Sequence, residues 1–361
     1  MAQEIQKTQH VIYQSTNNEL IDIYYMREPN WRFVNHTVST GAPSIIGKPS
    51  GFVYDLDNSQ NVAMRGVDGH IYLLNFVRNR GWEVSNITAT LGVPTATADI
   101  STYTYHVFNT KHIMYPGSDG HLHQLYYNME KGWRHADMAS QGAPPINGKP
   151  STFVHMENNS QNIIYRSQDG HIQHVFFVRD EGWHVQDVSA SIGAPPAVSN
   201  PSTYTYHVFN TQHVVYVSAD GHLHQLYYNT AKGWRDADMA GQGASLMKGR
   251  PAPIVDTVDN SQSISYCGQD NNIYILSFIR EEGWKNLNLS SLTGSPPAAG
   301  SPYAYTFDLF NSKHVVYRAV DGNIYQIYLT PGREWRTSNL SVTTGAPPAA
   351  GDPSAYTYDL K

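Results

Sequence analysis

Seven tryptophans recur along the chain at nearly constant intervals. The intervals between successive tryptophans are 51, 51, 50, 51, 50 and 51 residues, for Trp31, Trp82, Trp133, Trp183, Trp234, Trp284 and Trp335. A fixed period of this length is typical of architectures built by stacking one supersecondary unit many times. The 361 residues therefore predict one domain, residues 1–361, with seven repeats of about fifty residues, although length alone would suggest two or three domains.

Each repeat predicts four short antiparallel strands. In one repeat, residues 202–209 and 213–217 are runs of β-branched and aromatic residues, and Asp220 with Gly221 forms a strong hairpin signal before a third run at 223–228. Trp234 leads the fourth run. No segment of ten or more residues shows the helical period, which excludes helical solenoids and α/β folds. Four antiparallel strands make one propeller blade, so we expect an all-β, seven-bladed β-propeller.

The two ends of the chain predict how the ring closes. The first repeat lacks its first strand and starts almost directly at residues 9–13, whereas residues 353–359 are an extra copy of that missing strand. We therefore expect the C-terminal strand to join the N-terminal blade. This arrangement leaves only short, protected sheet edges.

The repeats fall into two classes. Residues 101–143 and 202–244 are identical at 33 of 43 positions, whereas the even-numbered repeats share a different signature, such as DNSQNVAMRGVDGHIYLLNFVRNRGW. Two kinds of site are therefore expected between blades. Residues 251–254 in blade 6 and 17–19 in blade 1 depart from the repeat, and sites formed by those blades are expected to be altered.

Composition excludes several classes of function. Lys and Arg number 24 against 30 Asp and Glu, a net charge of −6, so no basic patch for nucleic acid is expected. No run of about 18 apolar residues predicts membrane insertion, and the N-terminus lacks the apolar core of a signal peptide. We expect a soluble protein, made in the cytoplasm, with non-classical release as its route outside. Cys267 is the single cysteine, which excludes internal disulfides but leaves an interchain bridge open.

The repeated tryptophans have two interpretations. Each could be a packing wedge between neighbouring blades, or its face could bind the apolar face of a pyranose, and one ring can do both. The first-strand tyrosines and the serines that precede them offer hydroxyls for sugar recognition. Core packing of at least one tyrosine in each pair, and turn formation by the serines, are the favoured alternatives. These candidate carbohydrate-binding residues are Tyr103, Tyr204, Tyr305, Tyr356, Ser101, Ser151, Ser202 and Ser354.

No metal, cofactor or catalytic residue is predicted. Paired histidines occur at His121 and His123 and again at His222 and His224, but the other repeats place different residues at the second position, namely Tyr72, Gln173, Tyr274 and Tyr325. A metal site repeated by the fold would not tolerate this variation. Many of the Asp residues belong to the repeated turn, so no carboxylate pair stands out as the acid and base of a glycosidase.

The sequence pattern of the repeat resembles that of a known lectin family. Residues 314–328, 335–340 and 345–358 carry the closest match, and the resemblance extends over all seven repeats. The chain resembles the PLL-like seven-bladed β-propeller lectins, the fucose-binding lectin family of Photorhabdus type. The resemblance implies shallow pockets between adjacent blades, binding of L-fucose or O-methylated sugars, and assembly into homodimers or homotetramers.

The sequence thus predicts a multivalent carbohydrate-binding lectin that is not an enzyme. Its expected partners are fucosylated or methylated glycans on cell surfaces. Two alternatives stay open at this stage. In the first, the aromatics are wholly structural and the propeller is a scaffold for protein interaction. In the second, the chain is a glycoside hydrolase, which would need one carboxylate that cannot be replaced.

Overall fold

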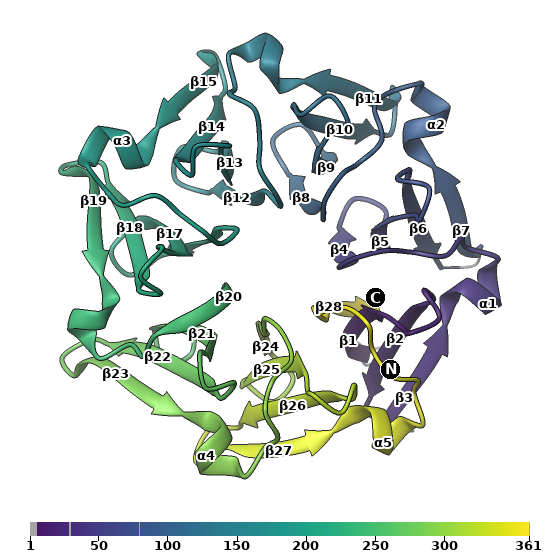
Figure 1. Cartoon of the computed structure of the whole chain (residues 1–361). Coiled ribbons are helices and arrows are strands. Elements are labelled where there is room, and N and C mark those ends of the chain that lie inside the picture. The colour runs from purple at the N-terminus through teal and green to yellow at the C-terminus, as the bar shows by residue number, and fades with distance from the viewer. Residues whose placement is uncertain (1–5, 29, 79, 361) are drawn as a thin grey trace, which may run out of the picture. The chain divides into compact units, whose positions relative to one another are not determined.

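The computed structural model describes residues 6–28, 30–78 and 80–360, and these form seven four-stranded antiparallel sheets (Figure 1). Each sheet is one blade, numbered here in chain order. The described residues divide into two compact units, one containing residues up to 95 and from 292 onward, the other residues 96–291. The predicted fold class, an all-β, seven-bladed propeller with four antiparallel strands in each blade, is confirmed.

The first unit contains blades 1, 2 and 7. Blade 1 consists of β28 (Ser354–Leu360), β1 (Gln6–Gln14), β2 (Leu20–Met26) and β3 (Asn30–Asn35). Blade 2 consists of β4 (Ser50–Tyr54), β5 (Ser59–Arg65), β6 (Ile71–Val77) and β7 (Gly81–Asn86). Blade 7 consists of β24 (Tyr303–Phe307), β25 (Ser312–Arg318), β26 (Ile324–Leu329) and β27 (Arg336–Asn339).

The second unit contains blades 3 to 6. Blade 3 consists of β8 (Ser101–Tyr105), β9 (Thr110–Pro116), β10 (Leu122–Asn128) and β11 (Gly132–Asp137). Blade 4 consists of β12 (Ser151–His155), β13 (Ser160–Arg166), β14 (Ile172–Val178) and β15 (Gly182–Asp187). Blade 5 consists of β16 (Ser202–Tyr206), β17 (Thr211–Val217), β18 (Leu223–Asn229) and β19 (Gly233–Asp238). Blade 6 consists of β20 (Met247–Asp256), β21 (Ser261–Gly268), β22 (Ile273–Ile279) and β23 (Gly283–Asn288).

The C-terminal strand completes the first blade, as the sequence predicts. β28 pairs antiparallel with β1 from Gln6↔Leu360 to Ile12↔Ser354, and Figure 1 shows the yellow C-terminal strand beside the purple N-terminal one. The backbone of β1 is therefore hydrogen bonded on both sides, to β28 and to β2. This pairing removes an open edge that would otherwise invite aggregation.

A single helical turn follows the fourth strand of every blade, which the sequence analysis did not predict. In blade 1, the Asn35 side chain accepts a hydrogen bond from the Val38 N–H, and Gly41 ends the turn at a φ of 73°. Asn or Asp at the N-cap and Gly in the left-handed region are the usual ends of a helix. The seven turns are α1 (His36–Thr40), α2 (Ile87–Leu91), η1 (Met138–Gln141), α3 (Val188–Ile192), η2 (Met239–Gln242), α4 (Leu289–Thr293) and α5 (Leu340–Thr344). None of the helices in the described chain is long and apolar enough to cross a membrane.

Three details differ from the predicted strands. The first strand of blade 5 ends at Tyr206, not at residue 209, because a turn that contains Asn210 at a φ of 49° leads into β17. Trp335 precedes β27 instead of leading it, since Arg333 and Glu334 separate it from the turn glycine that directly precedes most of the other tryptophans. In blade 6, β20 carries a register shift in the segment that departs from the repeat.

The core lies between neighbouring blades of the same unit. One cluster joins Tyr103 and Met114 of blade 3 to Ile163 and Val175 of blade 4. Another joins Val11 of blade 1 to neighbours in blade 7. Full burial of one such side chain contributes about 1.5–3 kcal/mol. Neighbouring blades of one unit are therefore held together through apolar side chains.

Candidate functional site

Two cavities open between neighbouring blades, one in each unit. The larger, the blade 3/4 pocket, has a volume of about 410 Å³ and is lined by β9, β10 and β11 on one side and by β13, β14 and β15 on the other. The smaller, the blade 1/2 pocket, measures about 230 Å³. Ligand sites for small molecules are typically clefts of a few hundred Å³, so both have the size of a candidate binding site.

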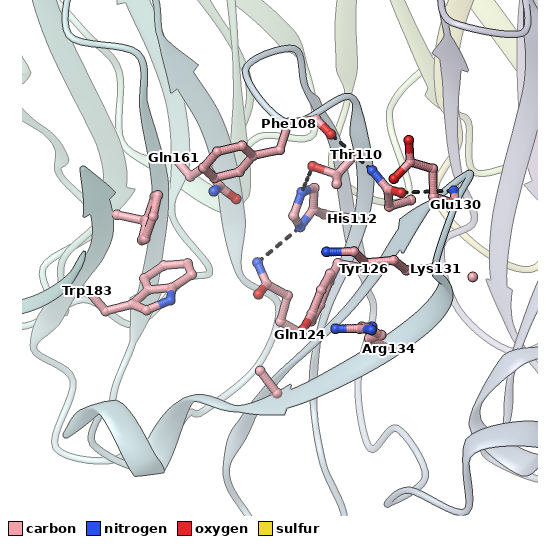
Figure 2. A pocket seen from close by; sticks show the side chains of 14 residues that line it. Phe108, Thr110, His112, Gln124, Tyr126, Glu130, Lys131, Arg134, Gln161 and Trp183 are labelled. Atoms are coloured by element: carbon pink, nitrogen blue, oxygen red, sulfur yellow. Dashed lines mark hydrogen bonds between the residues drawn. The ribbon is translucent and has the colours of Figure 1, made fainter. Parts of the chain in front are cut away.

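Trp183 forms one wall of the blade 3/4 pocket. In the β14–β15 hairpin it stands opposite Phe177, and their ring centroids are 5.3 Å apart. Trp183 is half-buried and also packs against the core cluster between the two blades. Figure 2 shows its ring on one side of the cavity and Tyr126 and Arg134 on the other. The tryptophan thus packs on the core, as the first interpretation predicts, and also lines the cavity. Its binding of a sugar stays a prediction.

A hydrogen-bonded chain forms the floor of this pocket. The Tyr103 hydroxyl donates to Oε1 of Gln161 at 2.7 Å and accepts from Nε2 of Gln124 at 3.0 Å. The same amide nitrogen lies 3.1 Å from Nδ1 of His112, and Nε2 of His112 lies 2.7 Å from the Thr110 hydroxyl. Because the amide can only donate to Nδ1, the imidazole carries its proton on Nε2. Burial lowers the pKa of His112 to about 3, so this floor is uncharged at neutral pH.

Charged groups stand only at the mouth of the blade 3/4 pocket. Lys131, Arg134 and Glu130 line it and are all exposed. The interior offers an amide, a neutral imidazole and aromatic surfaces. Such a combination can hold the hydroxyls of an uncharged ligand while an aromatic face covers its apolar side.

The blade 1/2 pocket has the same plan with different chemistry. Trp82 and Phe76 of blade 2 stand opposite each other in the β6–β7 hairpin, with ring centroids 5.2 Å apart. Blade 1 contributes His10, Asp22 and His36, all buried. Burial by itself raises the pKa of Asp22, but the charge and hydrogen bonds of the two histidines outweigh it and lower that pKa to about 2. This pocket therefore holds an ionised carboxylate.

The remaining tryptophans are half-buried and are not among the lining residues of these two pockets. Trp31 packs on the cluster between blades 7 and 1, Trp234 on that between blades 4 and 5, and Trp284 on that between blades 5 and 6. Trp133 stacks at a tilt on Tyr127 of its own blade, and Trp335 precedes its strand. Their role in binding stays a prediction.

The predicted tyrosines are buried between neighbouring blades. Tyr103, Tyr204, Tyr305 and Tyr356 are 7–8% exposed. Each hydroxyl donates to a glutamine of the next blade: Gln161, Gln262, Gln9 and Gln60 respectively. Each ring also stacks on a histidine, as Tyr103 does on His112 at 4.5 Å. These contacts connect each blade to the next through a hydrogen bond. None of the four tyrosines lines either pocket.

The predicted serines also join neighbouring blades. The hydroxyls of Ser101 and Ser151 lie 3.0 and 2.8 Å from those of Thr152 and Thr203. The hydroxyls of Ser202 and Ser354 donate to the carbonyls of Pro251 and Pro49 at 2.6 Å. None of the four lines either pocket. Among the predicted residues, only Trp82 and Trp183 line these two cavities.

The paired histidines brace turns. Nδ1 of His121 lies 3.0 Å from Asp137, whose other oxygen caps η1 through the Ala139 N–H. Asp119, His121 and Asp137 bring three potential ligand atoms within 4.8 Å of one another. Blades 4 and 5 repeat the same contact, His171 to Asp187 at 2.7 Å and His222 to Asp238 at 2.8 Å. A recurrent contact that caps a helical turn accounts for this group without an ion.

Sequence reasoning missed the histidine and glutamine floor. A signal for it was present, because a hydroxyl residue stands two positions before a histidine in every odd-numbered blade: Thr8 and His10, Thr110 and His112, Thr211 and His213, Ser312 and His314. Alternate residues of a strand face the same side, so this pattern places both groups together. In all four blades the hydroxyl lies 2.6–3.0 Å from Nε2 of the histidine.

Comparison with known proteins finds likeness at the level of structure. No family model matches the chain, and no curated protein matches its sequence. The BP39L lectin from Burkholderia pseudomallei superposes with a TM-score of 0.72 at 15% identity, over 91% of this chain and 93% of that chain. AofleA from Arthrobotrys oligospora gives 0.55 at 11%, over 87% and 89%. A fungal lectin from Aleuria aurantia, described as a six-bladed β-propeller with a novel mode of fucose recognition, gives 0.51 at 10%, over 90% and 96%. These likenesses establish that the chain has the β-propeller fold of solved lectin structures.

Proposed function

We propose that this chain is a multivalent carbohydrate-binding lectin that takes L-fucose or related sugars, including O-methylated ones, in pockets between adjacent blades. The observation that carries the proposal is the blade 3/4 pocket. There a half-buried tryptophan faces a floor of uncharged hydrogen-bonding groups across a cavity of about 410 Å³. A pyranose needs both features, because one of its faces is apolar and its rim is lined with hydroxyls.

The structural neighbours support the choice of sugar. The Aleuria aurantia lectin has been solved with Fucalpha1-6GlcNAc and with alpha-methyl-L-fucoside, and the SapL1 lectin with alpha methyl fucoside. Each superposes on this chain with a TM-score of 0.51–0.53 at 11–12% identity. We infer that fucosylated or methylated glycans on cell surfaces are the partners, and that homodimers or homotetramers multiply the number of sites.

The number of carboxylates that line each pocket fits a binding role without catalysis. Glycoside hydrolysis ordinarily uses a pair of carboxyl groups on either side of the scissile bond. Of the residues that line the two pockets, Glu130 is the one carboxylate in the first and Asp22 the one carboxylate in the second. Catalysis would therefore need a second carboxyl group from elsewhere.

The test is a glycan array with the purified protein, repeated with free L-fucose as competitor, followed by calorimetric titration of L-fucose. We expect fucose to inhibit binding to a narrow set of glycans. The W183A variant should bind at least one fewer fucose per chain, because the apolar sugar face loses its wall, and W183F should retain most of the affinity. A blank array would instead favour a protein partner.

The Tyr103→Phe variant is the matched control for Trp183. Removal of the hydroxyl leaves Oε1 of Gln161 without its donor in a buried site, which costs about 1–3 kcal/mol of folding free energy. We expect Y103F to lower the melting temperature and keep the fucose stoichiometry, whereas W183A should lose a fucose site in addition to the stability that its core packing contributes. Equal loss of binding in both variants would contradict a direct role that is specific to the tryptophan.

A further inference from the structure

Blade 1 departs from the repeat at two buried positions of its pocket. Asp22 pairs with Ile12 in the sheet, and the residues at the same register in blades 2 to 7 are Leu73, Gln124, His174, Gln225, Ile275 and Gln326. His36 begins the helical turn after the fourth strand, where blades 2 to 7 have Ile87, Met138, Val188, Met239, Leu289 and Leu340. Asp22 thus places a carboxylate where the other blades have an apolar, amide or imidazole side chain. His36 places an imidazole where the other blades have an apolar side chain.

These two residues and His10 form one polar cluster. Asp22 is 1% exposed, and its Oδ2 lies 2.9 Å from Nδ1 of His10 and 3.4 Å from Nε2 of His36. A carboxylate can only accept, so both imidazole nitrogens donate to it. In the blade 3/4 pocket the corresponding Gln124 donates to His112 instead. The amide of Gln124 donates to its histidine, whereas the carboxylate of Asp22 accepts from its histidines. The floor of the blade 1/2 pocket therefore presents an acceptor where that of the blade 3/4 pocket presents a donor.

The cluster retains unused acceptors. A carboxylate offers about four lone-pair sites, and the histidines make three contacts with them: Nδ1 of His10 lies 3.2 Å from Oδ1 and 2.9 Å from Oδ2, and Nε2 of His36 lies 3.4 Å from Oδ2. Nδ1 of His36 is buried without a hydrogen-bond partner, although the side chain is only 1% exposed. In the neutral form of His36, Nε2 carries the proton toward Asp22 and Nδ1 presents a lone pair. A ligand that supplies N–H donors would satisfy this buried acceptor.

The walls of the blade 1/2 pocket also suit a cation. Tyr24, Phe76 and Trp82 line it, and the His36 ring meets the Trp82 ring at 65° with centroids 4.6 Å apart. Aromatic faces attract ammonium groups through the negative charge of their π systems. No Lys or Arg is among the lining residues, in contrast to the blade 3/4 pocket with Lys131 and Arg134.

We propose that the blade 1/2 pocket binds an amine-bearing sugar, with its ammonium group held by Asp22 and the Nδ1 atom of His36 and its ring against Trp82. This inference rests on the proposed sugar-binding function and assigns one pocket a ligand class of its own. An N-acetylated or neutral sugar brings no positive charge to this buried carboxylate, whereas the amine supplies both a charge and several donors.

The test compares L-fucosamine, D-glucosamine and D-galactosamine with their N-acetylated counterparts, titrated calorimetrically at pH 7. We expect at least one free amine to bind at least tenfold more tightly than its acetylated form. Two variants each remove one member of the cluster. D22Q introduces the residue that blade 3 has at this position, Gln124, and H36M introduces the blade 3 residue Met138, so both are compatible with the fold. Each should abolish the tenfold preference and leave L-fucose binding at the other sites unchanged.

The outcomes separate this inference from the function on which it rests. If no sugar binds wild-type protein anywhere, the proposed function fails. If L-fucose binds but none of the three amines is preferred over its acetylated form, only the amine site is overturned. It is also overturned if the preference survives in both variants. Should one variant not fold, the other decides, and the double variant Gln124→Asp with Met138→His should create the preference in the blade 3/4 pocket.

Discussion

Individual residues have different roles at the blade junctions. Trp183 is half-buried and lines a cavity, whereas Tyr103 is buried and ties two blades together. Between them stands His112, whose ring stacks on the tyrosine and whose polar edge meets Gln124. Such histidines are neutral because they are buried, so the folded chain takes up fewer protons at acidic pH than the unfolded chain.

We expect stability to fall as the pH drops below 6.5. Burial lowers the pKa of His112, His174 and His213 to about 3 and that of His314 to about 4. Unfolded histidines take up protons near pH 6.5, so the unfolded chain binds more protons between pH 6.5 and 3. At pH 5 each such histidine contributes about 2 kcal/mol less to folding than it does at pH 7. Urea unfolding at pH 7, 6 and 5 measures the loss.

The His213→Asn variant provides the control for acid stability. Even-numbered blades carry Asn61 and Asn162 at the same register, so asparagine fits this strand. We expect a shallower dependence of stability on pH in this variant than in wild type. The half-buried His121, His171 and His222, whose pKa is raised by hydrogen bonds to Asp, act in the opposite sense. A stability that rises on acidification would show that these half-buried groups dominate.

At the scale of elements, the four-stranded blade is the unit that the sequence encodes, and blade 1 is assembled from both ends of the chain. β28 supplies its first strand, and Tyr356 and Tyr358 from that strand pack in the cluster between blades 1 and 2. The Tyr358 hydroxyl also donates to the Asn58 carbonyl at 3.0 Å. The last strand therefore contributes both a sheet edge and part of a junction.

Deletion of residues 354–361 should destabilise the protein severely. It uncovers the hydrogen-bonding edge of β1, whose Val11 and Ile12 are fully buried, and removes two core tyrosines. We expect a melting temperature lower by at least 10 °C, or aggregation through the open edge. Adding a synthetic peptide of residues 353–361 should restore part of the loss. Y358F, which loses one hydrogen bond, should cost only about 1 kcal/mol. A truncated chain as stable as wild type would contradict the role of β28.

At the scale of the whole molecule, the proposed function relies on repetition, which would multiply one weak site into several. The two described pockets lie in different compact units, and the proposal of one domain with seven repeats places further sites at the other junctions. Sites linked within one chain bind a surface with an effective concentration that a single site lacks. Weak binding of free sugar is therefore compatible with firm binding to a glycan-coated surface.

We expect the affinity for an immobilised fucosylated surface to rise steeply with the density of the glycan. W183A should reduce the number of fucose molecules bound in solution by one site, but it should weaken binding to the dense surface by tenfold or more, because avidity multiplies the contributions of separate sites. Surface plasmon resonance at low and high glycan density measures both. An affinity that does not depend on density would indicate a single functional site per chain.

The sequence by itself determined the architecture, because the signals for it are local and repeated. The period of the tryptophans, the Asp-Gly turns and the displaced copy of the first strand specify seven blades and the pairing of β28 with β1. Helical turns as short as five residues lack a periodic pattern, so they escaped prediction. The site depended on the tertiary structure, since each pocket joins residues of two blades: His112 and Trp183 are far apart in the chain and meet only when the sheets pack. The same packing buries Asp22 between two histidines, and burial, which no single strand specifies, gives that carboxylate its chemistry.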